Sequence, residues 1–377
     1  MRNPESMSLN PLLTGVRVLD LSRLLPGPFC SLYLAQLGAE VIKIEEPNGG
    51  DYARALSADL FDIVNRGKKS VTLDLRKPAD RDAFLELAKT ADVVLESFRP
   101  GVMDKLGCGF EAVRAVNPRI VFAALTGYGH TGPYRERAGH DMNYRGYAGE
   151  LDQVGATGQA PAPGNCQVAD LAGGALTCLA GILAALLGTR ASGVGTFVDA
   201  AMLDGTMALQ VIALSTVRQM GQSQPRGEDF LTGAMPNYAV YECADGKHLA
   251  VGALEPKFFH EVVRAVNRPD LLKLPMAAGP KGQPLRQALV ELFKSKSRDE
   301  WERELAHLDT CVSGVLTPAE ALQNEQVKAR GLVEMQNGKP VFGFPVKFSH
   351  ACTHTGTSPK LGADNAAVLP ARKGVTA

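Results

Sequence analysis

Short apolar runs alternate with helix-like stretches through the first half of the chain. Helix signals separate the runs: Pro26-Gly27-Pro28 opens a helix that ends near Gly38, and another helix runs from Pro78 to about residue 90. Strands alternating with helices indicate right-handed βαβ units and a mostly parallel sheet covered on both faces. We therefore expect a Rossmann-like α/β fold that binds ligands at the carboxyl ends of its strands. The predicted strands are residues 16–21, 40–45, 70–75, 92–97 and 119–126.

The pattern changes in the second half. A strand at 196–199 and a helix at 201–220 precede a polar linker at 221–229. Two alternating runs then flank Asp245-Gly246, which predicts a β-hairpin over 238–252, and helices follow at 256–266, 285–294 and 298–308. We predict a large α/β domain over 1–200 completed by residues 326–377, a linker helix over 201–228, and a small α+β domain over 229–325.

Residues 171–189 are nearly uncharged and about as long as a helix that crosses a bilayer. Glycines within the stretch and the lack of flanking hydrophobic spans favour a buried core helix. The chain has 377 residues, with 40 Lys and Arg against 40 Asp and Glu. Its zero net charge argues against broad binding to nucleic acid or to a membrane surface, but not against a local basic pocket.

Cysteine usage and the N-terminus bear on the compartment. The seven cysteines form no C-x-x-C pair, which predicts reduced thiols and neither a disulfide framework nor a zinc site. The first 15 residues lack the apolar core of a signal peptide, and Met7 offers an alternative start. We expect a cytoplasmic protein.

Two ionisable residues near glycines are the main candidates for chemistry. His140 follows Gly139 in a loop, and Asp170 precedes a helix whose first turn contains Gly173 and Gly174. Each has an ordinary explanation when taken alone: a surface or capping histidine, and a helix N-cap. Glycine in that turn costs about 1 kcal/mol relative to alanine, which is tolerable if the backbone must approach a ligand. The alternative is that His140 and Asp170 are two proton-transfer groups acting on an acidic C–H bond.

Other motifs are less specific. Residues 127–132 match G-x-G-x-x-G, but Pro133 follows where a dinucleotide site needs a helix, so we expect no nicotinamide or flavin site. Asp141 can cap a helix at 142–144, and Glu255 is a natural acid for a helix start. Some basic residues fit either phosphate binding or an ordinary solvated surface: Arg76, Lys77, Arg99 and Lys105. These residues alone indicate an α/β enzyme with an anionic ligand.

Six segments occur in order between about residues 14 and 330: LDLSRLLPGPFCSLYLAQLGAEVIKIEEP, VVLESFRPGVMDKLG, TGYGHTGPY, AGHDMNY, VADLAGG and AMLDG. Together they resemble the class III CoA-transferase superfamily, and within it the α-methylacyl-CoA racemase branch. The branch marker is His140 of the G-H-D-x-N-Y segment, because transferases usually carry another residue there.

The resemblance implies a 2-methylacyl-CoA substrate, an interlocked homodimer, and no cofactor or metal beyond the CoA of the substrate. His140 and Asp170 would face opposite sides of the α-carbon, Glu255 of the small domain would pair with His140, and Asp141 would support it. The CoA contacts would come from Leu73, Asp74, Leu75, Arg76, Ser97, Phe98, Arg99, Lys105, Gly139 and Tyr144.

This role agrees with the chemistry of thioesters. The α-proton is weakly acidic, so its removal needs a positioned base and a group that stabilises the enolate oxygen. A neutral His140 and a protonated Asp170 would serve one direction of racemisation, and the reversed states the other. Backbone N–H groups at the start of the Asp170 helix would receive the enolate oxygen.

Two positions depart from the racemase pattern. Cys166-Gln167 stand where racemases tend to have Asn-Leu, which leaves the acyl pocket and the acyl group undefined. Glu46 replaces a basic residue, so Lys43 or Arg54 would have to supply one CoA phosphate contact.

Asp170 fits a second chemistry as well. In a CoA-transferase it would attack the thioester and form an aspartyl-CoA thioester. A third alternative is an acyl-CoA-binding protein without turnover, which the presence of His140, Asp170 and Glu255 together disfavours.

Overall fold

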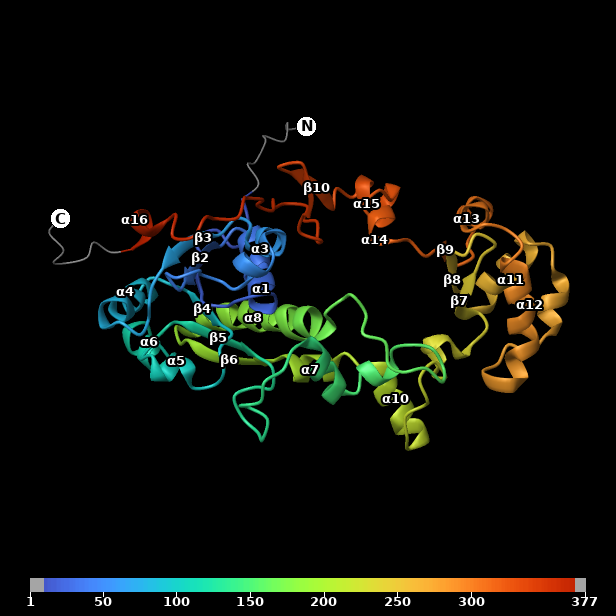
Figure 1. The fold of residues 1–377 in the computed structure, drawn as a ribbon, viewed down its shortest axis with the longest axis horizontal. Coiled ribbons are helices and arrows are strands. Elements are labelled where there is room, and N and C mark those ends of the chain that lie inside the picture. The colour runs from blue at the N-terminus through green and yellow to red at the C-terminus, as the bar shows by residue number, and fades with distance from the viewer. Residues whose placement is uncertain (1–9, 370–377) are drawn as a thin grey trace. The chain divides into compact units, whose positions relative to one another are not determined.

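A computed structural model describes residues 10–369, which form two compact units (Figure 1). The large unit comprises the described residues up to 148, residues 165–209, and those from 329 onward. The small unit comprises residues 149–164 and 210–328. The alternative start at Met7 lies outside the described residues.

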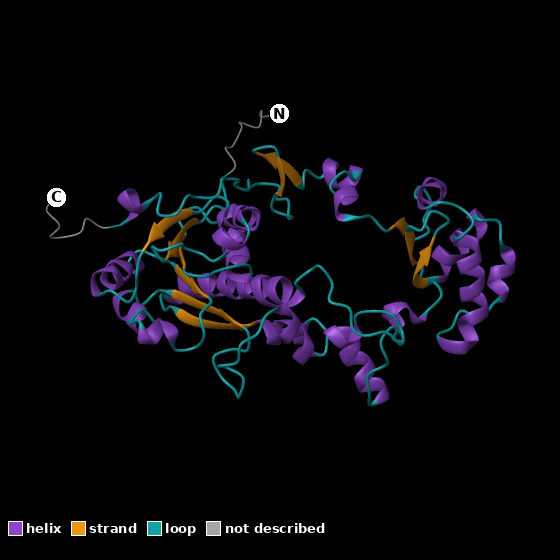
Figure 2. Cartoon of the chain, in the orientation of Figure 1, coloured by secondary structure: helices purple, strands orange, loops and turns teal. Residues whose placement is uncertain are grey.

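A six-stranded parallel sheet forms the centre of the large unit (Figure 2). Its strand order is β3-β2-β1-β4-β5-β6, the order of dinucleotide-binding α/β folds, in which the direction of winding reverses between β1 and β4. The predicted Rossmann-like sheet is confirmed. The strands are β1 (Arg17–Asp20), β2 (Glu40–Glu45), β3 (Lys69–Thr72), β4 (Val93–Glu96), β5 (Val121–Thr126) and β6 (Thr196–Ala201).

Helices cover both faces of this sheet because its strands are apolar on both sides. Successive side chains of a strand point to opposite faces. Leu95 of β4 therefore packs in the core beside α1 and α8, whereas Val94 packs in the core beside α4 and α6 (Figure 1). The covering helices are α1 (Pro26–Gln36), α4 (Pro78–Ala88), α5 (Val102–Lys105), α6 (Phe110–Val116) and α8 (Thr177–Ser192).

The helix after residue 168 begins in an unusual form. Ala169–Leu176 (η2) is a π-helix, which we call the π segment, and α8 continues from its end. The segment packs directly on α9 (Met202–Ala208), where a Cβ on Gly205 would lie 1.8 Å from the carbonyl oxygen of Gly173. Glycine at both positions thus permits the close approach of two backbones. Short π-helical turns within helices are frequent at functional sites.

We expect Gly205→Ala to lower the free energy of unfolding by about 3 kcal/mol, because the new methyl group forces α9 away from the π segment. Chemical denaturation measures the change. Gly188→Ala on α8 is the matched control: a Cβ there meets no atom within 4 Å, and better helix propensity predicts a gain of up to about 1 kcal/mol. Similar effects of both substitutions would contradict the importance of the close approach.

The small unit is α+β, as expected. β7 (Tyr238–Glu242) and β8 (His248–Gly252) form the predicted hairpin, and β9 (Val312–Gly314) pairs with β8. Helix residues Phe259, Leu289 and Trp301 pack with the sheet in one core. The helices of this core are α11 (Pro256–Ala265), α12 (Gln283–Phe293) and α13 (Arg298–Leu305).

Some elements differ from the prediction. The helix predicted over 201–220 is interrupted at residues 209–210, so α9 is followed by a separate α10 (Val211–Met220). The sequence patterns did not predict α2 (Ala53–Leu56) or α3 (Ala58–Asn65). The remaining elements are α7 (Asp141–Ala148), η1 (Leu151–Gln153), η3 (Phe230–Ala234), η4 (Pro269–Lys273), η5 (Gly279–Gly282), α14 (Pro318–Ala321), α15 (Glu325–Ala329), β10 (Val333–Gln336), β11 (Lys339–Phe342) and α16 (Asn365–Val368).

The long apolar helix is only partly buried. Of the helices within residues 10–369, the continuous Ala169–Ser192 alone is long and apolar enough to cross a bilayer. Cys178 and Ile182 are buried in the core of the large unit, whereas Leu176 and Leu187 are exposed. The predicted core helix is present, but only one of its faces is covered within the chain.

Candidate active site

Asp170 lies in the first turn of the π segment, and a second aspartate caps that turn. Oδ1 of Asp141 accepts hydrogen bonds from the N–H groups of Ala169 (2.7 Å) and Asp170 (3.2 Å). Oδ2 of Asp141 lies 3.4 Å from Nη1 of Arg145, and both residues are buried. The interpretation of Asp170 as a helix cap is therefore wrong. Asp141 is the cap, and its carboxylate bonds the Asp170 turn and not His140.

The surroundings of Asp170 favour its protonated form. Burial raises the pKa of its carboxyl, and the nearby charge of Asp141 raises it further, to about 7. Both effects penalise the carboxylate relative to the neutral acid. Titratable groups shifted toward neutral pH in this way are the usual acids and bases of active sites.

His140 is held through the peptide group that precedes it. The Tyr144 hydroxyl donates to the carbonyl oxygen of Gly139, and the N–H of His140 donates to Oδ1 of Asn143 (3.0 Å). Both holding side chains belong to α7, which starts directly after His140. His140 itself is exposed. Its backbone is thus fixed while its imidazole can meet a ligand.

Tyr144 fills a niche between two glycines. A Cβ on Gly127 or Gly139 would lie 2.4 Å or 2.7 Å from Cε1 of Tyr144. The Tyr144 ring also meets Tyr128 edge-on, with 5.1 Å between centroids. The G-x-G-x-x-G motif at 127–132 therefore serves packing, and no helix opens within it. The CoA contacts expected of Gly139 and Tyr144 stay predictions.

The first backbone N–H groups of the π segment already have acceptors. Asp141 accepts those of Ala169 and Asp170, and the N–H of Leu171 donates to the carbonyl oxygen of Gln167 (2.9 Å). These three groups are therefore not free to receive an enolate oxygen, and for the N–H groups that follow them in the helix the expectation stays a prediction.

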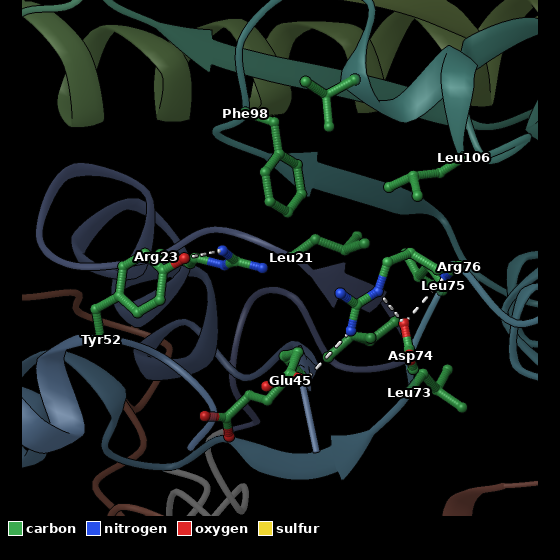
Figure 3. A pocket seen from close by; sticks show the side chains of 13 residues that line it. Leu21, Arg23, Glu45, Tyr52, Leu73, Asp74, Leu75, Arg76, Phe98 and Leu106 are labelled. Atoms are coloured by element: carbon green, nitrogen blue, oxygen red, sulfur yellow. Dashed lines mark hydrogen bonds and ion pairs between the residues drawn. The ribbon is translucent and has the colours of Figure 1, made fainter. Parts of the chain in front are cut away.

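A cavity of about 400 Å³ opens at the carboxyl ends of β1, β2 and β3, and we call it the strand-end pocket (Figure 3). Five predicted CoA residues line it: Leu73, Asp74, Leu75, Arg76 and Phe98. The rest of the predicted set lies outside its lining: Ser97, Arg99, Lys105, Gly139 and Tyr144. The other lining residues are Leu21, Arg23, Ile44, Glu45, Glu46, Tyr52, Val102 and Leu106.

Arg23 is a cation of this pocket that sequence reasoning missed. Its Nη1 donates to the Tyr52 hydroxyl (3.1 Å), and its guanidinium lies 5.0 Å and 4.8 Å from the ring centroids of Tyr52 and Phe98 (Figure 3). The next residue, Leu24, has φ 64°, a strained value for a residue other than glycine. A fixed arginine at a strand end suits an anionic ligand. Its place two residues after the first predicted strand was the available signal.

Buried ion pairs occupy the interior near these strand ends. Lys43 lies 2.8 Å from Asp51, Lys68 lies 3.2 Å from Asp20, and all four side chains are buried. Burial alone would raise the pKa of Asp20, but the charges of Lys68 and Lys43 outweigh it and lower the pKa to about 2. Lys43 is therefore not available to a CoA phosphate, and that prediction is wrong.

Arg54 is also committed to an internal partner. Its Nε and Nη2 donate to the two carboxylate oxygens of Glu45, each at 2.8 Å. A bidentate pair of this kind is among the stronger charge-assisted contacts. Arg54 is therefore a poor substitute for the missing phosphate contact.

Glu255 belongs to the small unit. It immediately precedes α11, it is exposed, and its side chain makes no capping hydrogen bond. Its pairing with His140 stays a prediction. Within residues 10–369, no group of three or more His, Cys, Asp or Glu side chains is placed to hold a metal ion.

The sequence profile of CoA-transferase family III matches residues 13–365, almost the whole chain. The chain belongs to CoA-transferase family III. Members of this family are enzymes, and an acyl-CoA substrate is consistent with it. Both racemases and transferases occur among the relatives.

Individual relatives show this division. Alpha-methylacyl-CoA racemase of Homo sapiens is 37% identical over 322 residues, which cover 85% of this chain and 81% of the relative. Succinate--glutarate CoA-transferase of Agrobacterium fabrum is 32% identical over 389 residues, covering 95% of each chain. A solved CaiB/BaiF family protein from Brucella suis has a TM-score of 0.85 at 30% identity, covering 96% of this chain and 99% of its own.

Proposed function

We propose that the chain is a 2-methylacyl-CoA racemase, which interconverts the two configurations at C2 of the acyl group. The observation that carries the proposal is the position of Asp170 in the first turn of the π segment beside the carboxylate of Asp141, where burial and this neighbouring charge raise the pKa of Asp170 to about 7. A protonated carboxyl can donate a proton, whereas attack on a thioester requires the carboxylate. Similarity to the human racemase and the exposed His140 support the same assignment.

The proposed reaction uses one group on each face of C2. His140 removes the α-proton, and the electron pair of the C–H bond moves into the thioester carbonyl to form an enolate. Asp170 then delivers its proton to C2 from the opposite face, which inverts the configuration. In the reverse direction Asp170 is the base and His140 the acid. In either direction, His140 and Asp170 together hold one proton when the reaction begins.

We also propose how the site is completed. Glu255 orients the imidazole of His140, and the complete site forms in an interlocked homodimer, with the small domain of a second copy supplying Glu255. The acyl-CoA is the substrate, and the chemistry described needs no additional cofactor. The cytoplasmic location stays a prediction.

The alternative is a class III CoA-transferase with Asp170 as the nucleophile. The observation in its favour is the similarity to the succinate--glutarate enzyme over 95% of both chains. Incubation with one enantiomer of a 2-methylacyl-CoA in D₂O, without any acceptor acid, separates the two. The racemase loses the C2–H signal in the NMR spectrum. No loss of that signal, with CoA transfer to added glutarate, would overturn the proposal.

We expect His140→Ala to slow exchange on the order of 10³-fold for the enantiomer whose C2–H faces His140, because it removes the proposed base for that enantiomer. Binding of CoA should remain within about twofold of wild type, since no CoA contact depends on the imidazole in this account. His260→Ala, an exposed histidine on α11, is the control and should exchange normally. A wild-type exchange rate in His140→Ala would contradict the assigned role.

A further inference from the structure

Glu46 lies at a position that contacts the ribose of bound nucleotides in folds with this strand order. It is the first residue after β2, and it lines the strand-end pocket. In sheets with the order 3-2-1-4-5-6, an acidic residue near the end of the second strand accepts hydrogen bonds from ribose hydroxyls, whereas arginine there accommodates a ribose phosphate. The choice of side chain at this strand end therefore decides whether a free or a phosphorylated ribose binds well.

The Glu46 carboxylate is fixed in place. Asn48 donates to it from its backbone N–H (2.9 Å) and from Nδ2 (3.3 Å). Nη2 of Arg76 lies 3.5 Å from Oε1 of Glu46. A carboxylate held from two sides cannot turn away from a ligand without losing these contacts.

The positive charge of Arg76 is already balanced. Its Nε donates to Oδ1 of Asp74 (2.7 Å), in addition to the contact with Glu46 (Figure 3). Arg23 instead faces neutral partners, the Tyr52 hydroxyl and the aromatic rings of Tyr52 and Phe98. Among the described residues, no ion pair joins Arg23 to a carboxylate, whereas Arg76 pairs with both Glu46 and Asp74.

This charge distribution suits the nucleoside and pyrophosphate of a nucleotide but not a phosphate on its ribose. A cavity of about 400 Å³ with a largely apolar wall can accept a nucleoside, and Arg23 can meet its pyrophosphate. A ribose phosphate beside Glu46 and Asp74 would bring like charges together, whereas a ribose hydroxyl can donate to either carboxylate.

We propose that Glu46 makes the strand-end pocket recognise a free ribose hydroxyl, so that the chain binds 3′-dephospho-CoA at least as tightly as CoA. The proposal rests on the proposed function in one respect, that the ligand is a CoA thioester. It assigns Glu46 as a specificity-determining residue and extends the substrate class to thioesters of 3′-dephospho-CoA.

Isothermal titration calorimetry with CoA and with 3′-dephospho-CoA tests this directly on the full chain. We expect 3′-dephospho-CoA to bind wild type more tightly than CoA, or at most about threefold more weakly. Glu46→Gln should shift the ratio several-fold toward CoA, and Glu46→Lys by about tenfold, because each step reduces repulsion of the phosphate. Glu86→Lys, which makes the same charge change on α4 outside the pocket lining, should leave the ratio unchanged.

Two results would overturn the inference. One is a wild-type preference for CoA of more than about threefold. The other is a ratio that Glu46→Lys moves no further than Glu86→Lys does. Circular dichroism confirms that each variant is folded. Because neither ligand carries an acyl group, the binding ratio is independent of catalysis. A failure of C2 exchange would contradict the racemase proposal and leave this measurement intact.

Discussion

Asp170→Asn is expected to slow exchange on the order of 10³-fold for the enantiomer whose C2–H faces Asp170 and, at pH 8, to make the fold more stable than wild type. The two effects have one cause. The side chain that donates a proton is a carboxyl placed where its charged form is unfavourable, with a pKa raised to about 7 from an ordinary value of 3.8. Asparagine has nearly the same shape and carries no charge.

The sign of the stability effect follows from proton binding. A carboxyl whose pKa is raised on folding stabilises the fold below its unfolded pKa, and this contribution is lost as pH rises through the folded value. The wild type therefore loses this contribution to stability between about pH 4 and pH 7, whereas Asp170→Asn has no such contribution to lose. We expect the variant to be about 2–4 kcal/mol more stable at pH 8, and the difference to shrink at pH 5.

Urea denaturation at the two pH values measures this difference. Asp82→Asn, on the exposed side of α4, is the control and should change stability little at either pH. A variant that is inactive but no more stable than wild type at pH 8 would contradict the protonated state of Asp170. A variant that keeps full exchange would contradict its catalytic role.

Asp141 is expected to show the largest loss of stability. Asp141→Ala removes the acceptor of two N–H groups in the π segment and takes a carboxylate from buried Arg145, so we expect a cost of about 3–5 kcal/mol. Asp141→Asn keeps an oxygen acceptor for these N–H groups and should cost less. Chemical denaturation of the two variants distinguishes the contribution of the hydrogen-bond acceptor to stability from the contribution of the negative charge.

The same pair of variants reports on Asp170. Either substitution removes a negative charge beside it and should lower its pKa by a similar amount. The pH above which exchange declines should then move down in both variants, although their stabilities differ. An unchanged pH profile in both would show that Asp141 acts only as a cap.

The sheet was predictable from the sequence because each strand is a compact apolar run between turn or helix signals. β2 and β5 are examples in which the predicted and observed strands nearly coincide. The hairpin around Gly246 was predictable for a local reason too, since an Asp-Gly turn favours that conformation. These features depend on residues close together along the chain.

The features that could not be predicted from the sequence depend on contacts between residues far apart along the chain. The bonds from Asp141 to the π segment join residues 28 and 29 positions apart, and nothing local marks Asp141 as the cap of that helix. The π-helical form arises where Gly173 meets Gly205 of another helix. The sequence offered Lys43 as a contact for a CoA phosphate, yet Lys43 is buried and pairs with Asp51. Such pairings are decided by packing and not by sequence pattern.

The central claim is that Asp170 works as a proton donor and not as a nucleophile. The pH dependence of deuterium incorporation at C2, measured between pH 5 and pH 10 without an acceptor acid, tests it most directly. A pair that must hold one proton predicts a bell-shaped rate that declines on the alkaline side of about pH 7, with the same limbs for both enantiomers. No incorporation at any pH, or a rate that continues to rise as Asp170 ionises, would contradict the account.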